Sequence, residues 1–223
     1  MSDLLRFIRK YEFPVHLMVG SAAVRARFST WIGTARAKFL LRMLGCRAGK
    51  NFQVDGRLWI WCPRKRAIHI GDNVKINSRF GSNLVGLTNP SVFQCWDNGT
   101  ITIGNYCGLS GVVLSARAGI TIGDHVMVGG NVRIFDHNFH SLDFKKRRNN
   151  AEDQADCKKS PVVIGNDVFI GTNAMILKGV AVGDRAIIGA GSVVTCDVPA
   201  DEIWAGNPAV RLKAASGGRR TED

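Results

Sequence analysis

A period of six residues runs through the second half of the chain. From Ile164 the sequence reads IGNDVF, IGTNAM, ILKGVA, VGDRAI, IGAGSV and VTCDVP, six units in unbroken phase that end at Pro199. Each unit begins with Ile or Val, Gly usually follows, and a small or aliphatic residue stands fifth. Further units begin at Ile70, Ile103, Leu109, Ile122, Val128 and Ile134. A fixed period of this kind predicts a repeat architecture.

A six-residue period fits neither an α-helix nor a simple alternating strand. A short strand of about five residues followed by a tight turn winds the chain into a coil, whose neighbouring turns hydrogen-bond about 4.8 Å apart. The first position of each unit faces inward and stacks on its equivalents, and the following Gly permits backbone angles that a β-carbon disfavours. Three units complete one triangular turn, so residues 164–199 supply two turns.

The period is interrupted between Ile134 and Ile164. Thirty residues separate these positions, which is five whole units, so the phase is retained. The intervening first positions are, however, charged or polar: His140, Lys146, Glu152 and Lys158. Burying such side chains unpaired is too costly. We therefore predict a loop near 136–160 that leaves the coil and rejoins it near Pro161, and long loops on rigid scaffolds commonly carry function.

The block IGNDVFIGTNAMILKGVAVGDRAIIGAGSVVTCDVPADEIWAGNPAV resembles the hexapeptide-repeat acyltransferases, specifically the acetyl-CoA O-acetyltransferases of the maltose/galactoside and polysaccharide-modifying type. The resemblance covers residues 70–210. It implies a mainly β fold, a left-handed parallel β-helix, that forms a homotrimer and binds acetyl-CoA in the groove between neighbouring subunits. It also implies transfer of an acetyl group to a sugar hydroxyl, on a surface polysaccharide or its lipid-linked precursor, without a metal.

The same resemblance places a catalytic histidine where the loop leaves the coil. The motif DHNFHSL matches D-T-D-F-H-S-L of some sugar-modifying relatives, which favours His140 as the base and His137 as its pocket partner. Which of the two is the base stays open. A neutral imidazole would take the proton of the acceptor hydroxyl as its oxygen attacks the thioester. Asp136 would orient an imidazole or hold an acceptor hydroxyl, and Asn138 and Ser115 are further acceptor-binding candidates.

Positions that would meet acetyl-CoA follow from the resemblance too. Phe169 occupies the slot of a family tryptophan and would line the groove, while Thr172 and Ala190 would meet the pantetheine arm and Thr195 the adenine end.

Arg211 and Lys213 would meet the CoA phosphates, where charged hydrogen bonds are strongest. The sequence departs from the family at Cys196, which replaces a common lysine, and at Val210, where some relatives have arginine. The acceptor-binding residues of the galactoside enzymes have no match near Ser110–Arg117, which argues against a simple galactoside as substrate.

The N-terminal region carries the charge of the protein. Residues 1–66 hold 14 Lys and Arg against three acids, whereas the remainder is close to neutral although the whole chain has a formal charge of +12. Residues 22–44 place apolar side chains at helical spacing: Val24, Phe28, Trp31, Ala35, Phe39 and Met43. We expect a basic helical region over 1–66 that either caps the first coil or lies on a membrane surface. The β-helix domain would span 67–213 and a flexible tail 214–223.

Several classes are disfavoured. The six cysteines include no C-x-x-C pair, which argues against a zinc site or disulfide framework and favours a reducing cytosol. The longest uncharged N-terminal run, residues 13–24, is shorter than the roughly 20 residues of a membrane span, and no secretory signal is evident. We expect a cytoplasmic protein, with contact to the inner face of the membrane as an open alternative. No motif for nucleic-acid binding is present.

Two other functions stay open. A γ-type carbonic anhydrase-like metalloenzyme uses the same coil but needs three histidines on a metal, and His125, His137 and His140 are the candidates. A non-catalytic solenoid scaffold would bind no acetyl-CoA and would tolerate changes at both loop histidines.

Overall fold

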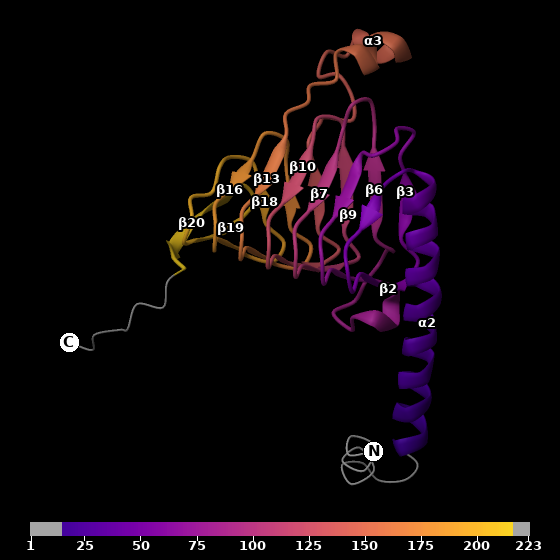
Figure 1. Cartoon of the computed structure of the whole chain (residues 1–223). Coiled ribbons are helices and arrows are strands. Elements are labelled where there is room, and N and C mark those ends of the chain that lie inside the picture. Colours follow the sequence, from indigo (N-terminus) through magenta and orange to yellow (C-terminus); the bar gives the residue numbers. More distant parts are fainter. Residues whose placement is uncertain (1–14, 216–223) are drawn as a thin grey trace, which may run out of the picture.

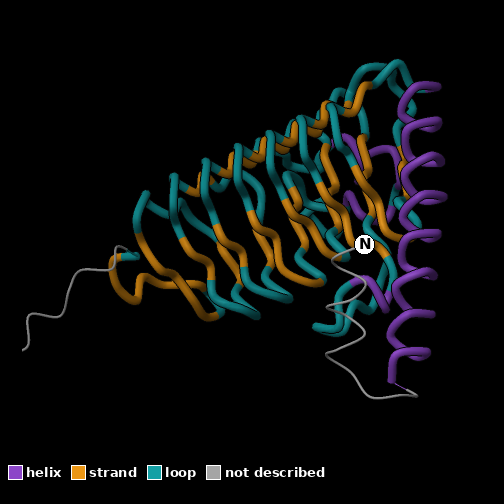
Figure 2. The backbone as a smooth tube through the Cα atoms, turned by 60° about the horizontal axis from the view of Figure 1, so that its bottom comes forward, coloured by secondary structure: helices purple, strands orange, loops and turns teal. Residues whose placement is uncertain are grey.

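The body of the protein is a triangular coil of parallel strands (Figure 1). The computed structural model describes residues 15–215, with side chains from residue 19 onward. Three sheets, here called A, B and C, form the sides of the triangle, and Figure 2 shows the turns stacked along one axis. The predicted fold class, a mainly β hexapeptide-repeat coil of the left-handed parallel β-helix type, is confirmed.

The strands follow one another around the triangle. Sheet A consists of β1 (Arg47–Ala48), β4 (Ile68–Ile70), β7 (Ile101–Ile103), β10 (Ile120–Ile122), β13 (Val162–Ile164) and β16 (Ala181–Val182). Sheet B consists of β2 (Gln53–Gly56), β5 (Lys75–Ser78), β8 (Gly108–Ser110), β11 (Met127–Gly130), β14 (Phe169–Ile170), β17 (Ile187–Ile188), β19 (Glu202–Gly206) and β20 (Ala209–Ala214). Sheet C consists of β3 (Trp59–Trp61), β6 (Val92–Cys95), β9 (Val113–Ala116), β12 (Arg133–Phe135), β15 (Met175–Ile176) and β18 (Val193–Val194).

The predicted inward positions form the core. Each is buried and stacks on its equivalent in the next coil, as Ile122 does between Ile103 and Ile164. From the regular block these residues are Ile164, Ile170, Ile176, Val182, Ile188 and Val194. Burying an aliphatic side chain of this size contributes about 1.5–3 kcal/mol. The stack therefore stabilises the coil along its whole length.

The glycines after the inward residues are required by close packing between coils, and not by the backbone angle expected from sequence. The backbone at Gly123 is not left-handed, but a β-carbon there would lie 2.6 Å from Asn166 Oδ1 and 2.8 Å from the carbonyl of Gly165. The Asp or Asn that follows Gly binds the coil before it: Asp124 Oδ1 accepts the backbone N–H of Asn105 at 2.6 Å. These bonds hold the pKa of Asp124 below its ordinary value.

Two segments leave the coil. Residues 79–91 form a loop between sheets B and C that contains η1 (Phe80–Ser82), and the six-residue pattern did not predict this loop. Residues 136–160 leave after β12 and return before β13, as predicted, and contain η2 (Lys146–Arg148) and α3 (Asn150–Ala155). The loop 136–160 projects from one edge of the coil in Figure 1. We call the A-to-B, B-to-C and C-to-A edges the first, second and third corners, so this loop leaves at the third.

A long helix, α2 (Val15–Met43), lies across the open end of the coil (Figure 1). It packs through Gly33, Ala37 and Leu41, and a β-carbon at Gly33 would overlap the carbonyl oxygens of strand β2. Thr34 Oγ1 accepts the N–H of Val54 at 2.9 Å. The helix therefore caps the coil.

Two expectations for this region differ from the structure. The packing face of α2 is not the apolar series from Val24 to Met43, whose large members are all exposed. The first coil begins at Arg47 rather than at residue 67. Ala48, Val54 and Ile60 of β1, β2 and β3 lie six residues apart and pair with Ile70, Ile76 and Phe93 of the next coil. No helix among residues 15–215 is long and apolar enough to cross a membrane. The predicted tail from 216 onward lies outside the described residues.

Candidate active site

Asp136 fixes the point at which the loop 136–160 leaves the coil. Its carboxylate is buried and accepts the backbone N–H groups of Arg117, Ala118 and Gly119 at 2.7, 2.8 and 2.5 Å. Three such donors satisfy most of the acceptor capacity of a carboxylate. Asp136 thus joins two successive coils at the third corner, and its carboxylate has little capacity left for an acceptor hydroxyl.

His137 is held by the same carboxylate. Its Nδ1 lies 3.0 Å from Asp136 Oδ1, and its side chain is only 2% exposed. The ring packs against Phe139, with 4.7 Å between centroids, and the backbone pairs with Lys159 across the base of the loop. His137 is therefore enclosed at the base of the loop, and one side of its ring lines the cavity described below.

His140 stands in a more open setting. Its Nδ1 lies 2.7 Å from Asp153 Oδ2, while its side chain is 67% exposed. The bond from His140 and a backbone bond from Ser141 hold the pKa of Asp153 below its ordinary value. Asp153 is therefore ionised at neutral pH and can only accept, so Nδ1 of His140 is the donor of this bond. The opposite ring nitrogen, Nε2, lies on the far side of the ring from Asp153.

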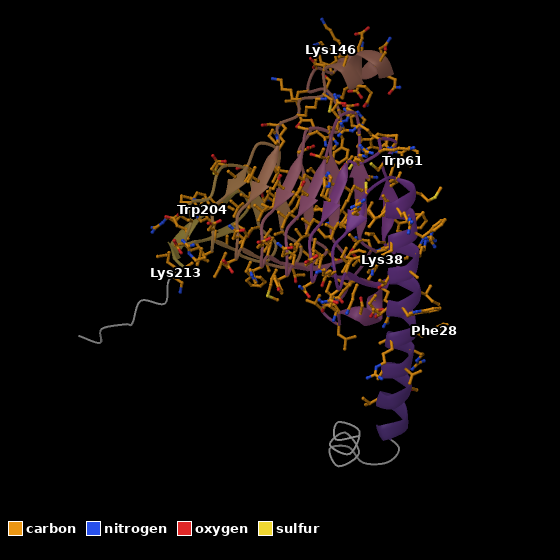
Figure 3. The ribbon with its side chains drawn as sticks, viewed as in Figure 1. Phe28, Lys38, Trp61, Lys146, Trp204 and Lys213 are labelled. Carbon is orange, nitrogen blue, oxygen red and sulfur yellow. The ribbon has the colours of Figure 1, made fainter. Side chains whose placement is uncertain are left out.

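Charge pairs give the loop 136–160 a fixed shape. Asp156 accepts from Ser141 Oγ at 2.5 Å and from Lys146 Nζ at 2.6 Å, and Arg147 donates to the carbonyl of Ser141. These contacts lower the pKa of Asp156 and raise that of Lys146. Figure 3 shows Lys146 on the projecting part of the loop, away from the coil. The charged residues of the loop 136–160 thus support the segment that carries His140.

Both histidines line one cavity of about 300 Å³ at the third corner. The remaining lining residues come from the ends of successive sheet C strands and from the loop: Gln94, Trp96, Arg117, Phe139 and Gln154. Sequence reasoning missed Gln94, Trp96, Arg117 and Gln154. The register of the coils was the one signal that could have identified these residues. Gln94 of β6 pairs with Ser115 of β9, and Ser115 pairs with Phe135 of β12, so the ends of these strands lie side by side.

Two predicted acceptor-binding residues lie beside the cavity and not on its lining. Ser115 is fully buried in β9, and its Oγ has no hydrogen-bond partner among the described residues. Asn138 is half-buried at the base of the loop, where its backbone N–H donates to the carbonyl of Lys158 and its carbonyl accepts from Cys157. Their roles stay predictions.

A second cavity, of about 420 Å³, lies at the second corner. Phe169 and Thr172 line it together with residues of four coils and of the loop 79–91: Lys75, Asn77, Asn83, Val85, Gly108, Ser110, Met127, Val128, Gly129 and Gly130. Asn77 Oδ1 is buried there without a partner among the described residues. A β-carbon at Gly108 would meet nothing within 4 Å, so the floor of the groove is open at that point.

The other predicted acetyl-CoA contacts are spread over the same end of the coil. Ala190 lies one coil beyond Thr172, whose carbonyl accepts from the N–H of Gly191, whereas Thr195 follows β18 at the third corner. Arg211 binds Glu202 at 2.6 Å, and Lys213 is exposed on β20 near the C-terminal end (Figure 3). The structure brings Phe169, Thr172 and Ala190 together, and it places Thr195 on the corner of the histidines.

The histidines proposed for a metal are not gathered in this chain. His125 stacks on Tyr106 at the first corner, with 4.9 Å between the ring centroids, whereas His137 and His140 lie at the third. Within the described residues, no group of three or more His, Cys, Asp or Glu side chains is placed to hold a metal ion.

The regular repeats match a known sequence family. Residues 161–196 match the sequence family described as bacterial transferase hexapeptide (six repeats). A protein of Schizosaccharomyces pombe named as an acetyltransferase is 41% identical over 94 residues, 42% of each chain. A 2,3,4,5-tetrahydropyridine-2,6-dicarboxylate N-acetyltransferase of Staphylococcus aureus is 58% identical over 57 residues, 26% of this chain and 24% of the relative. The chain thus covers less than half the length of these relatives.

Solved structures share the coil. AntD, an N-acyltransferase from Bacillus cereus in complex with dTDP and 3-hydroxybutyryl-CoA, has a TM-score of 0.61 at 22% identity, over 79% of this chain and 87% of AntD. A hexapeptide-repeat-containing acetyltransferase from Vibrio cholerae has a TM-score of 0.54 at 27% identity, over 88% of this chain and 90% of the other. Residues 161–196 therefore carry the repeats of the bacterial transferase hexapeptide family, and the chain has acetyltransferases among its relatives.

Proposed function

We propose that this protein transfers an acetyl group from acetyl-CoA to a hydroxyl group of a sugar, on a surface polysaccharide or its lipid-linked precursor. One observation carries the proposal: His140 has a carboxylate 2.7 Å behind Nδ1 and an exposed ring edge on a cavity. The donor is supported by relatives named as acetyltransferases and by a second structure of the Vibrio cholerae acetyltransferase, which is complexed with acetyl-CoA.

His140 is the proposed general base. Nε2 takes the proton of the acceptor hydroxyl while the oxygen attacks the carbonyl carbon of the thioester. The tetrahedral intermediate collapses, the carbon–sulfur bond breaks, and the imidazolium returns the proton to the departing CoA thiolate. General base catalysis of this type contributes about 10²–10⁴-fold in rate. Asp153 keeps the proton on Nδ1 and stabilises the imidazolium that forms, as a carboxylate behind a catalytic histidine does in other enzymes.

His137 is the alternative base, and its surroundings favour a positioning role. The ring is nearly inaccessible, and it contacts Phe139 and Asp136 at the base of the loop. Loss of His137 would shift His140, which stands three residues further along.

The cavity has the chemistry of a sugar site. Gln94, Arg117 and Gln154 offer donors and acceptors for hydroxyl groups, and Arg117 Nη2 already donates to Gln154 Oε1 at 2.5 Å. Trp96 provides an aromatic face against which the apolar side of a sugar ring can pack. A few polar groups on a mostly apolar wall are typical of small-molecule sites.

Acetyl-CoA would lie in the groove at the second corner. Lining residues from β5, β8, β11 and β14 follow one another along the coil axis, so an extended pantetheine arm can meet successive backbones. The open floor at Gly108 and the partnerless Asn77 Oδ1 fit a polar chain lying there. Lys213 is free to meet a phosphate, whereas Arg211 would first have to leave Glu202.

The donor groove and the histidines lie on different corners of one chain, and sheet C separates them. A second copy would bring the groove of one subunit to the loop 136–160 of its neighbour. We therefore propose a homotrimer in which each site is shared between two subunits. A cytoplasmic location belongs to the same proposal, since free cysteines fit a reducing compartment.

Thermal unfolding with and without acetyl-CoA tests the donor first, because it requires no knowledge of the acceptor. A ligand at 100 times its dissociation constant stabilises the folded protein by about 2.7 kcal/mol, enough to raise the melting temperature measurably. No shift at saturating acetyl-CoA would refute the proposed donor.

An acetyl transfer assay that detects free CoA thiol then tests the acceptor, with sugars and their amino-sugar analogues compared. An amine acceptor is the competing outcome, because the Staphylococcus aureus relative is named as an N-acetyltransferase. Turnover of the amino sugar alone would replace the hydroxyl by an amine in this proposal.

A further inference from the structure

The outward face of α2 carries an apolar stripe without a partner among the described residues. Its large side chains are strongly exposed, including Phe28 at 62% and Trp31 at 69%. The stripe comprises Val24, Phe28, Trp31, Ile32, Phe39 and Met43. Gly33, Ala37 and Leu41, which contact the coil, lie on the opposite side of the helix, and Figure 3 shows Phe28 pointing away from the body.

Cationic side chains border this stripe on both sides. At 3.6 residues per turn, Arg25 and Arg36 follow one edge, while Arg27 and Lys38 follow the other. The 29 residues of α2 contain no Asp or Glu, so no acidic side chain on the helix offsets these cations. A cavity of about 780 Å³ between the helix and the first coils adds Lys75 to Arg27 and Lys38, and Asp55, which also lines it, is paired with Arg79.

Aromatic and apolar groups of the first coil continue the surface. Trp61 is half exposed and lines a cavity of about 270 Å³ together with Met43 of the stripe. Figure 3 shows Trp61 beside one end of α2. Trp59 is also exposed, and the Arg57 guanidinium lies 3.4 Å above its ring. Tryptophan and arginine in this combination are typical of surfaces that meet the boundary between water and lipid.

We propose that the outward face of α2, with Trp61 at its end, docks on the surface of an anionic phospholipid bilayer. We infer a bilayer with anionic lipids because the cations along α2 complement its negative surface. An apolar stripe bordered by cations, on a helix too short in apolar residues to span, lies in the plane of the interface with its apolar side in the acyl boundary. The coil would then stand on the membrane through its capped end. This proposal is independent of the acetyl transfer activity.

Vesicle co-sedimentation tests the proposal on the full chain. We expect the protein to sediment with equimolar phosphatidylglycerol and phosphatidylcholine vesicles, and not with phosphatidylcholine alone. Replacing Arg25, Arg36 and Lys38 by Gln should weaken binding by about 5-fold per charge. Replacing Lys145, Arg148 and Lys158 by Gln on the loop 136–160 removes the same charge and should have little effect. High salt should weaken binding, because surface charges are screened over about 8 Å at 0.15 M.

The double variant Phe28→Ser with Trp31→Ser tests the apolar contribution to binding. Its control is the double variant Tyr106→Ser with Val163→Ser, at exposed positions of the coil. The first pair should abolish binding and the second should leave it unchanged. A blue shift of fluorescence on vesicle addition should be smaller in Trp31→Phe, in which Trp61 is the remaining tryptophan of the docking face. Circular dichroism would show that the variants fold, since these side chains do not support the coil.

Three results would overturn the proposal. One is the absence of binding to anionic vesicles, and another is binding that neither α2 variant changes. The third is concentration-dependent self-association, lost in Phe28→Ser with Trp31→Ser and without vesicle binding, which would assign the face to a second copy of the chain.

Discussion

His140 and Asp153 are joined by a contact of 2.7 Å between Nδ1 and Oδ2, although they stand on opposite arms of the loop 136–160. His137 and Asp136 form a similar contact of 3.0 Å between adjacent residues. The two pairs differ in what lies on the far side of the imidazole. His140 presents an exposed edge, whereas the ring of His137 is enclosed. This difference is the reason for proposing His140 rather than His137 as the base.

Replacement of His140 by Ala should lower kcat by about 10²–10⁴-fold, because it removes the proposed base for the hydroxyl proton. Asp153→Asn should lower kcat by at least about tenfold, since an amide can stabilise the wrong tautomer of the ring. Steady-state kinetics with acetyl-CoA and an identified acceptor measure both.

His137→Ala and His125→Ala are the matched comparisons. We expect His137→Ala to lower the melting temperature together with kcat, and His125→Ala at the first corner to leave kcat unchanged. A larger kcat loss in His137→Ala than in His140→Ala, in protein that melts normally, would transfer the role of base to His137.

Asp136→Ala should destabilise the fold. It removes the acceptor of three backbone N–H groups at the third corner and leaves them buried without partners. Each unsatisfied donor costs about 1–3 kcal/mol, so we expect a loss on the order of 4 kcal/mol in the free energy of unfolding. Denaturant titration measures this loss, with Asp167→Asn at an exposed turn as the control. Equal midpoints for the two variants would contradict the anchoring role of Asp136.

Ile170→Ala tests the inward stack. Ile170 is fully buried between Val128 and Ile188 of the neighbouring coils, and truncation of such a side chain costs about 2–5 kcal/mol. Val163→Ala, on the outer side of β13, should cost far less. Denaturant midpoints compare the two changes, and a similar effect of both would mean that the six-residue period does not identify the core.

The core and the loop could be predicted from sequence because each depends on residues that lie close together in the chain. Each inward residue lies six positions from the next, and the loop is marked by charged residues at positions such as Lys146 that the period would bury. Those signals need no knowledge of which coils are neighbours.

The remainder of the site depends on that knowledge. Gln94 and Arg117 meet at one corner only because β6, β9 and β12 stack in register, and the loop 79–91 changes the spacing before β6. Asp153 could not be chosen from sequence among the acids of the loop, since its contact with His140 depends on the path of α3. The helical spacing of the apolar residues on α2 was predicted from sequence, but this spacing alone does not show which face of the helix packs on the coil.

Acid should weaken the loop 136–160 before it affects the inward stack. The folded-state pKa values of Asp153 and Asp156 lie below their ordinary value of 3.8, so their contacts stabilise the loop above that pH and are lost as the pH falls through the lowered values. The difference in melting temperature between wild type and Asp153→Asn should shrink as the pH falls below 3.8. A difference that persists at lower pH would show that Asp153 acts through packing and not through its charge.

Cys196 should be the one thiol that reacts in the folded protein. It is exposed, whereas the other five cysteines are buried. Burial, together with the neighbouring Cys62, raises the pKa of Cys95, and burial raises the pKa of Cys107, so few thiolates form at these sites. Titration with a thiol reagent should label one group before denaturation and all six after it, and Cys196→Ser should remove the first. Since Cys196 adjoins Thr195, at the proposed adenine end of the donor, saturating acetyl-CoA should slow its labelling. An unchanged rate under conditions where acetyl-CoA raises the melting temperature would place the adenine elsewhere on the coil.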